Sequence, residues 1–185
     1  MKLKHLDRKK AALLLVDIQE KLFPLVDHPC EMLDKLLTLI KGCQVLNLPI
    51  LMSEQYPKGL GHTIPAIRDL VGESVKAVPK TTFSCLADPA FEKAAQQIKR
   101  SQWILGGIEA HVCILQTARS LLEMGQEVIV VNDAISSRSI YDFSTAIAEL
   151  RDMGARITST ETVLFELLQD AAIPEFKQMI ELIKK

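Results

Sequence analysis

The sequence predicts a three-layer αβα fold, in which helices cover both faces of a six-stranded, mostly parallel sheet. Short apolar runs alternate along the chain with longer stretches whose apolar residues recur at helical spacing. The first run, Ala11–Val16, is apolar throughout, which is typical of a parallel strand buried on both faces. Right-handed crossovers between successive strands then place helices on both sides of the sheet.

The first half of the chain is expected to contribute three strands. After Ala11–Val16, apolar residues at helical spacing predict a helix over Pro29–Leu48, which Pro49 ends. The second strand is expected at Ile50–Ser53 and the third at Ser74–Val78, each as a short apolar stretch.

The second half repeats the alternation of helix and strand. Asp88 is a good N-cap and Pro89 a good first helical residue, so a helix is expected from there to about Arg100. Strand four is expected at Gln102–Leu105, before two glycines. The elements expected after it are a helix around His111–Met124, a strand at Glu127–Asn132, a helix over Ser139–Met153, a strand at Ala155–Thr158, and two helices, the last starting at Pro174.

Length and composition favour a single domain, residues 1–185, that binds neither nucleic acid nor a membrane. The 185 residues are 48% hydrophobic and 24% charged, with 22 Lys and Arg against 23 Asp and Glu and no basic stripe. No apolar run approaches the roughly 20 residues that span a bilayer. The basic and then apolar start resembles a signal peptide, but Asp17 and Gln19 interrupt it and no cleavage site follows. We therefore expect a cytoplasmic protein.

The chain has four cysteines, at positions 30, 43, 85 and 113. No two of them have the Cys-x-x-Cys spacing of zinc knuckles and thioredoxin-type sites. In a reducing cytosol all four are expected to be free thiols, so the question is whether one of them is reactive.

In parallel α/β sheets, ligands bind beyond the carboxyl ends of the strands, so residues at these ends are the first candidates for chemistry. The residues that follow the expected strands are Asp17, Glu54-Gln55-Tyr56, Pro79-Lys80, Gly106 to Cys113, and Asn132-Asp133.

Cys113 follows a glycine-rich strand end and lies in the first turn of an expected helix. The free N–H groups and partial positive charge of a helix N-terminus favour a thiolate and stabilise an oxyanion. The alternative is a small buried hydrophobic residue, and position alone does not separate the two.

Asp17 and Lys80 each have an ordinary explanation as well as a catalytic one. Asp17 is either a base that takes a thiol proton, a helix cap, or a solvated residue at the end of the strand. Lys80 is either a cation that steadies a carboxylate and a thiolate or a solvated surface charge. A nucleophile, a base and a cation at neighbouring strand ends together form the set that an activated thiol requires.

Three motifs resemble those of the isochorismatase-like cysteine hydrolases, a superfamily with a Rossmann-like fold that includes nicotinamidases and N-carbamoylsarcosine amidase. The motifs are LLLVDIQ with Asp17, VPKTTFS with Lys80 and GIEAHVCILQTA with Cys113. The resemblance spans nearly the whole chain and implies that Asp17 is the catalytic acid–base, Lys80 its partner and Cys113 the nucleophile. It also implies a cis peptide bond between Ile108 and Glu109, with the N–H groups of Glu109 and Cys113 as oxyanion donors.

Within this superfamily, SEQYPKGLGHT (53–63) is most similar to isochorismatase domain-containing proteins of unassigned substrate. Nicotinamidases carry an Asp-x-His pair and further histidines for a metal in this region. Here Ser53, Glu54 and Gln55 occupy it and His62 stands alone, so we expect no metal and no cofactor. True isochorismatases lack the cysteine nucleophile, so an isochorismatase activity is not expected.

The resemblance implies hydrolysis of a small amide-like substrate through a thioester on Cys113. Gln19, Phe23, Gln55 and Tyr56 follow strands one and two and are candidate substrate-binding residues, although the two aromatic residues are equally candidates for packing. His111 is expected to be structural or interfacial.

Two alternatives to hydrolysis remain from the sequence, namely a thiol or redox protein and a small-molecule-binding protein on the same scaffold. The family usually forms dimers or tetramers, which makes a homo-oligomer the expectation. The apolar C-terminal stretches 163–168 and 173–183 would serve either an interface or the covering of the sheet.

Overall fold

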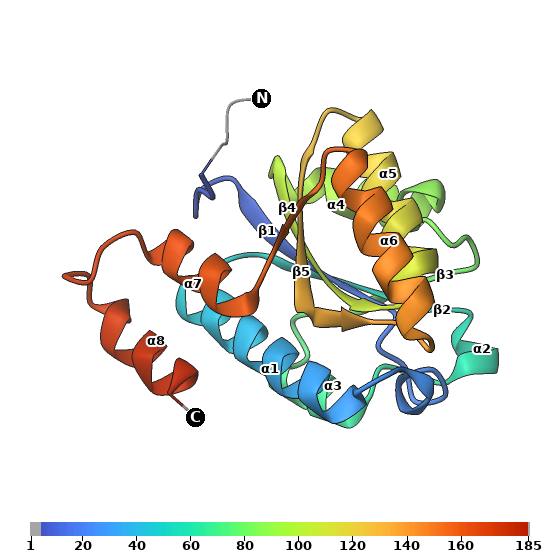
Figure 1. Cartoon of the computed structure of the whole chain (residues 1–185), viewed down its shortest axis with the longest axis horizontal. Helices are drawn as coiled ribbons and strands as arrows, with labels where there is room; N and C mark the ends of the chain where they lie inside the picture. The colour runs from blue at the N-terminus through green and yellow to red at the C-terminus, as the bar shows by residue number, and fades with distance from the viewer. Residues whose placement is uncertain (1–4, 185) are drawn as a thin grey trace.

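The computed structural model describes residues 5–184 and confirms the predicted fold class. Six parallel strands form one sheet in the order β3-β2-β1-β4-β5-β6, and helices lie on both of its faces (Figure 1). The chain builds outward from β1 to β3 and then returns to place β4 on the other side of β1. The sheet therefore has a topological switch point between β1 and β4, which is where α/β sheets bind ligands.

The strands and helices have the following bounds. The strands are β1 Ala11–Val16, β2 Ile50–Gln55, β3 Ala77–Lys80, β4 Gln102–Ile108, β5 Glu127–Ser136 and β6 Arg156–Thr158. The α-helices are α1 Pro29–Val45, α2 Pro57–Leu60, α3 Pro65–Val71, α4 Pro89–Ile98, α5 Leu115–Glu123, α6 Ile140–Asp152, α7 Thr160–Leu168 and α8 Glu175–Ile183. Short turns of other helical types are η1 Phe23–Leu25, η2 Cys85–Ala87 and η3 Ala110–Ile114.

Two hydrophobic cores flank the sheet, because successive side chains of a strand point to opposite faces. On β1, Leu13 and Leu15 belong to the core beneath α1, α3, α7 and α8, whereas Leu14 and Val16 belong to the core beneath α4, α5 and α6. All six residues of β1 are buried, as expected for a central parallel strand. Burial on both sides fixes the register of β1 and therefore the position of the residue that follows it.

Strands two, three and four end later than the sequence predicted, and β4 runs through Gly106 and Gly107 to Ile108 instead of ending at Leu105. β2 continues through Gln55, and β3 begins at Ala77 rather than Ser74 and includes Lys80. The delay follows from α3, which ends at Val71 and leads into a turn at Gly72 before the chain reaches the sheet. Lys80 pairs with Gln55 in register, so it is part of the strand rather than a residue beyond it. Pro79 is tolerated there because β3 is an edge strand.

The prediction that Asn132 and Asp133 follow strand five was wrong. β5 runs on to Ser136, and its pairing with β4 shifts register so that Leu105 faces Val130 while Gly107 faces Ile135. Asp133 instead accepts hydrogen bonds from the N–H (2.8 Å) and hydroxyl (2.9 Å) of Thr160 and so caps the start of α7.

The C-terminal helices pack against α1 on the same face of the sheet. Buried apolar residues of α7 and Met179 of α8 belong to the same core as α1, which accounts for much of the apolar pattern of stretches 163–168 and 173–183. Among residues 5–184, no helix combines the length and apolar character needed to span a membrane.

Candidate active site

Asp17 and Lys80 form a fully buried ion pair at the carboxyl ends of β1 and β3. Lys80 Nζ donates to Asp17 Oδ2 at 2.7 Å, and both side chains have an exposed fraction of 0%. Burial alone would lower the pKa of Lys80, but the charge of Asp17, the nearby thiols and the hydrogen bond with Asp17 together outweigh burial, and the pKa is raised. Lys80 is therefore a permanent cation beside the carboxylate at neutral pH.

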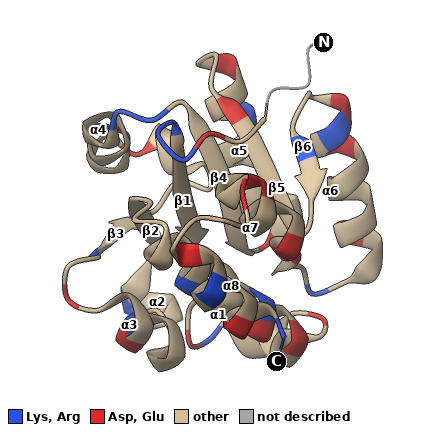
Figure 2. Cartoon of the chain, turned by 90° about the vertical axis from the view of Figure 1, so that its left-hand side faces the viewer, with Lys and Arg blue, Asp and Glu red and all other residues tan. Residues whose placement is uncertain are grey.

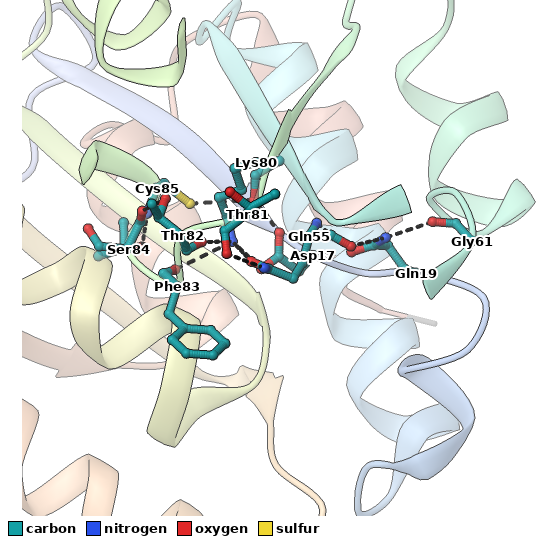
Figure 3. A network of polar contacts seen from close by, with 12 residues as sticks. Asp17, Gln19, Gln55, Gly61, Lys80, Thr81, Thr82, Phe83, Ser84 and Cys85 are labelled. Atoms are coloured by element: carbon teal, nitrogen blue, oxygen red, sulfur yellow. Dashed lines mark hydrogen bonds and ion pairs between the residues drawn. The ribbon is translucent and has the colours of Figure 1, made fainter. Parts of the chain in front are cut away.

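A buried polar network holds the ion pair in place (Figure 3). Lys80 Nζ also donates to Gln55 Oε1 at 2.6 Å and to the carbonyl oxygens of Thr82 (3.2 Å) and Phe83 (3.4 Å). On the other side, the Ser53 hydroxyl donates to Asp17 Oδ1 at 2.7 Å. Each oxygen of the carboxylate thus accepts a hydrogen bond from a different strand.

Gln19 and Gln55, two predicted substrate-binding residues, belong to this network. The Gln19 side chain donates to the carbonyl oxygens of Gln55 (3.0 Å) and Gly61 (2.6 Å) and accepts from the Gln55 N–H (2.7 Å). The Gln55 amide donates to Thr81 O at 2.8 Å while its oxygen binds Lys80. The structure therefore uses both amides to brace the segments around the ion pair.

Cys113 lies in η3, the wide helical turn between β4 and α5, and is 6% exposed. A position at a helix N-terminus favours a thiolate, whereas the surroundings of Cys113 act in the opposite direction. Burial, followed by the negative charge of Asp17, raises the pKa of the Cys113 thiol well above its ordinary value, and the hydrogen bond with Asp17 acts in the same direction. Lys80 opposes this shift without overcoming it. At neutral pH the site holds a neutral thiol against a carboxylate.

Glu109 precedes this turn and is joined to Ile108 by a cis peptide bond. Its carbonyl oxygen accepts from the N–H groups of Val112 (3.1 Å) and Ile114 (3.2 Å), which closes the turn around Cys113. Its carboxylate binds Arg138 Nε at 2.8 Å. The N–H groups of Glu109 and Cys113 therefore belong to one tight segment, and their service as oxyanion donors stays a prediction.

The aromatic candidates differ in their surroundings. Phe23 is half-buried and packs against the core beneath α1, whereas Tyr56 is exposed and follows β2 with a left-handed backbone. Phe83, which the sequence did not single out, is also exposed, and its carbonyl oxygen lies against Lys80. His111 Nδ1 lies 3.0 Å from the Ser137 hydroxyl, in agreement with a structural role.

Two residues at the site, Ser53 and Cys85, were not recognised as parts of it from the sequence. Cys85 begins η2, is fully buried and donates its thiol to Ser53 Oγ at 3.5 Å. For Ser53 the available signal was a hydroxyl at the end of an apolar strand. Cys85 gave none, because the turn that brings it back to the strand ends is not visible in its local sequence.

Glu54 and His62 lie beside the site and bind each other rather than forming a metal site. His62 Nδ1 is 3.1 Å from Glu54 Oε2, and the other carboxylate oxygen accepts from the N–H and hydroxyl of Thr63. Within the part of the chain that the structure describes, no group of three or more His, Cys, Asp and Glu side chains is arranged to hold a metal ion.

Comparison with known sequences identifies relatives over almost the whole chain. The family model described as the isochorismatase domain matches residues 11–162. Isochorismatase domain-containing protein 2 from Danio rerio is 41% identical over 179 residues, which cover 97% of this chain and 89% of that protein. Isochorismatase domain-containing protein 1 from the same fish is 40% identical over 91% of this chain and 59% of its own length.

Solved structures show the same fold. The MAR1 ribonuclease from Caenorhabditis elegans is 37% identical, with a TM-score of 0.92 over 98% of this chain and 93% of that one. YcaC from Pseudomonas aeruginosa, solved with hexane-2,5-diol and covalent acrylamide, is 26% identical, with a TM-score of 0.92 and the same coverage of both chains.

Proposed function

The chain belongs to the isochorismatase family, and from that premise we propose that it is a cysteine hydrolase of a small amide-like substrate. The proposed nucleophile is Cys113, with Asp17 as acid–base and Lys80 as the cation that supports both. The proposed enzyme is a single domain and needs no metal or cofactor for this chemistry.

The observation that carries the proposal is the fully buried ion pair beside a buried thiol. Removing two charges from water costs several kcal/mol per ion, which makes an ion pair such as Asp17–Lys80 a poor device for stability alone. Buried ion pairs whose charges also act on a neighbouring nucleophile cluster at functional sites. Here both charges act on Cys113, and Asp17 and Cys113 follow β1 and β4, the two strands on either side of the switch point.

In the proposed first half-reaction, Asp17 takes the proton of the Cys113 thiol as the sulfur attacks the substrate carbonyl carbon. The negative charge moves from the carboxylate to the carbonyl oxygen, where the N–H groups of Glu109 and Cys113 stabilise it. Asp17 then returns the proton to the leaving amine, the C–N bond breaks and a thioester remains on Cys113.

In the second half-reaction, Asp17 takes a proton from water and the resulting hydroxide attacks the thioester carbonyl. The C–S bond breaks, the acid product leaves, and the proton on Asp17 returns to the sulfur. Lys80 keeps its proton throughout and balances one negative charge, whether that charge is on Asp17 or on the sulfur.

The raised pKa of Cys113 fits this sequence of steps. Moving the proton from the thiol to Asp17 relocates one negative charge without changing the net charge of the buried site. The low-dielectric surroundings oppose a change in the number of charges far more than such an internal transfer. The thiol can therefore rest in its neutral form and ionise only as the substrate is attacked.

The test is turnover of a panel of small amides, ureas and esters by wild type and by C113A. Wild type is expected to hydrolyse at least one class, and C113A to lose this activity by several orders of magnitude. The control variant C30A removes an exposed thiol outside the site and should keep full activity. Turnover that survives in C113A would remove Cys113 from the mechanism.

A second candidate function, cleavage of RNA, is suggested by the name of the MAR1 ribonuclease relative. The charge distribution disfavours it, because RNA backbones are bound by clusters of Lys and Arg. The net charge is −1, and acidic and basic residues are interspersed on α1 and α8 (Figure 2). A single-stranded RNA is therefore included in the panel. If wild type cleaves only the RNA, and C113A does not cleave it, ribonuclease activity is favoured over amide hydrolysis.

A thiol or redox function is the other candidate, and the second buried thiol favours it. The ionisation of Cys113 is influenced by Cys85, which is hydrogen-bonded through Ser53 to the carboxylate beside Cys113. Reversible loss of both thiols on treatment with peroxide, without hydrolysis of any substrate in the panel, would favour this function over hydrolysis.

We also propose that the protein forms a homo-oligomer. Large apolar side chains are exposed at the start of α6, where Tyr141 is 81% and Ile140 57% exposed. Exposed apolar side chains of this size are typical of surfaces that contact another protein. Light scattering after gel filtration should give a mass at least twice 20.6 kDa.

A further inference from the structure

Ser53 lies on β2 directly beside the last residue of β1. It pairs in register with Val16, and its hydroxyl donates to Asp17 Oδ1 at 2.7 Å. The other carboxylate oxygen accepts from Lys80. The two oxygens of the base are therefore held by one neutral donor and one charged donor, both fully or almost fully buried.

Cys85 fixes the direction in which the Ser53 hydroxyl donates. Its thiol donates to Ser53 Oγ at 3.5 Å, so the single proton of the hydroxyl is left to point at Asp17. Burial raises the pKa of Cys85 to about 11, so the thiol stays protonated at neutral pH and remains a donor. Cys85, Ser53 and Asp17 thus form a chain in which each group donates to the next.

We propose that Ser53 is a positioning residue for Asp17, and that its hydroxyl, oriented by Cys85, limits how readily Asp17 takes the Cys113 proton. This inference rests on the proposed function, in which Asp17 is the base. It assigns the residue that sets the strength of that base. Lys80 holds one oxygen of the carboxylate and Ser53 the other.

Removing the Ser53 hydroxyl should have an effect on Cys113 that removing a purely structural serine would not have. A hydrogen bond to an ionised carboxylate stabilises the charged form, so without it Asp17 should accept the Cys113 proton about tenfold more readily. The same change raises the fraction of sites in which the proton has moved from Cys113 to Asp17. Two observables must then move together, namely the rate at which Cys113 reacts and the pH below which it stops reacting.

The experiment measures alkylation of Cys113 by iodoacetamide between pH 4 and 9, with the modified peptide quantified by mass spectrometry. Wild type is expected to show a rate plateau around neutral pH and a fall in rate, the acid limb, at lower pH. In S53A the plateau should rise about tenfold and the acid limb should move up by about one pH unit. S53T retains a hydroxyl and should restore the wild-type profile.

S84A is the matched control, because it removes another nearly buried hydroxyl close to the site. Ser84 Oγ is bonded to Ser120 Oγ at 2.8 Å and not to Asp17, so its removal should leave both the plateau and the acid limb unchanged. Circular dichroism of each variant verifies the fold. If S53A does not fold, S53C replaces it, and its weaker donor should shift both observables in the same direction by less.

An S53A profile that matches wild type, or a lower plateau with an unmoved acid limb, overturns the inference. D17N separates this failure from failure of the proposed function. If D17N loses the plateau while S53A changes nothing, only the role of Ser53 is wrong. If D17N retains the wild-type profile, Asp17 is not the base, and both the proposed function and this inference are wrong.

Discussion

Replacing Lys80 by methionine should destabilise the fold strongly, because it leaves the Asp17 carboxylate buried without its cation. Both side chains of the pair are fully buried, and the Nζ–Oδ2 distance is 2.7 Å. Removing one member of a buried ion pair costs about 3–5 kcal/mol. For a chain of this length, each kcal/mol lowers Tm by about 2–4 °C, so the expected decrease is about 6–20 °C.

The double variant D17N/K80M tests whether the unpaired charge is the cause. Asparagine retains an acceptor for the Ser53 hydroxyl and tolerates the left-handed backbone at this position, where φ is 52°. With both charges removed, no carboxylate is left uncompensated, so the double variant should be more stable than K80M by at least about 1 kcal/mol. Thermal unfolding followed by circular dichroism at pH 7 measures both variants. A double variant less stable than K80M would refute the reasoning, since the loss would then come from packing and not from charge.

Three further predictions concern the stability of the fold. Burial raises the pKa of Glu54, but hydrogen bonds from Thr63 and the interaction with His62 together outweigh burial and lower it. The hydrogen bond from Arg156 lowers the pKa of Glu166. Both carboxylates therefore stabilise the fold above the ordinary value of 4.5, and this contribution is lost as the pH falls through their folded pKa values. Urea unfolding at pH 7 and pH 4 should show this loss, and a smaller loss in E54Q and E166Q; equal losses in all three proteins would contradict it. G107A should yield little folded protein, because a Cβ would lie 2.1 Å from Val16 O, whereas G125A meets no atom within 4 Å and costs only backbone strain of about 1 kcal/mol; equal yields and Tm values would refute this contrast. D88A removes the cap that accepts from the N–H groups of Ala90 and Phe91 and should cost about 0.5–2 kcal/mol in urea unfolding, and an unchanged midpoint would mean that the cap contributes nothing.

The sequence predicted the arrangement of strands and helices because the spacing of apolar residues within each segment indicates its secondary structure. The apolar run Ala11–Val16 and the N-cap at Asp88 each occur where expected. The structure brings the three predicted catalytic residues to one edge of the sheet, and this follows from strand order and parallel pairing. The register of a buried strand fixes the position of the residue that follows it, so the location of such a residue can be predicted from the sequence.

Features that depend on contacts between distant segments were not readable. The extension of β5 past Asp133 depends on its pairing with the glycine-containing end of β4, and the local sequence of β5 does not indicate this pairing. Gln19 and Gln55 were predicted to bind substrate because they are polar and follow strands, and this stays a prediction, whereas the hydrogen bonds of their amides to neighbouring segments were not predicted. The position of Cys113 at a helix start left a reactive thiol and a buried hydrophobic residue equally open, because the burial and the Asp17 charge that raise the pKa of its thiol come from distant segments.

The most direct test of the central claim is to trap the acyl-enzyme. The protein is mixed with an excess of a substrate found in the panel, quenched in acid within the first turnovers and digested for peptide mass spectrometry. The account predicts that the peptide containing Cys113 gains the mass of the acyl group, that alkaline hydroxylamine removes this mass, and that the peptides of Cys30, Cys43 and Cys85 stay unmodified. An acyl group on any other residue, or substrate turnover by C113A at the wild-type rate, would contradict it.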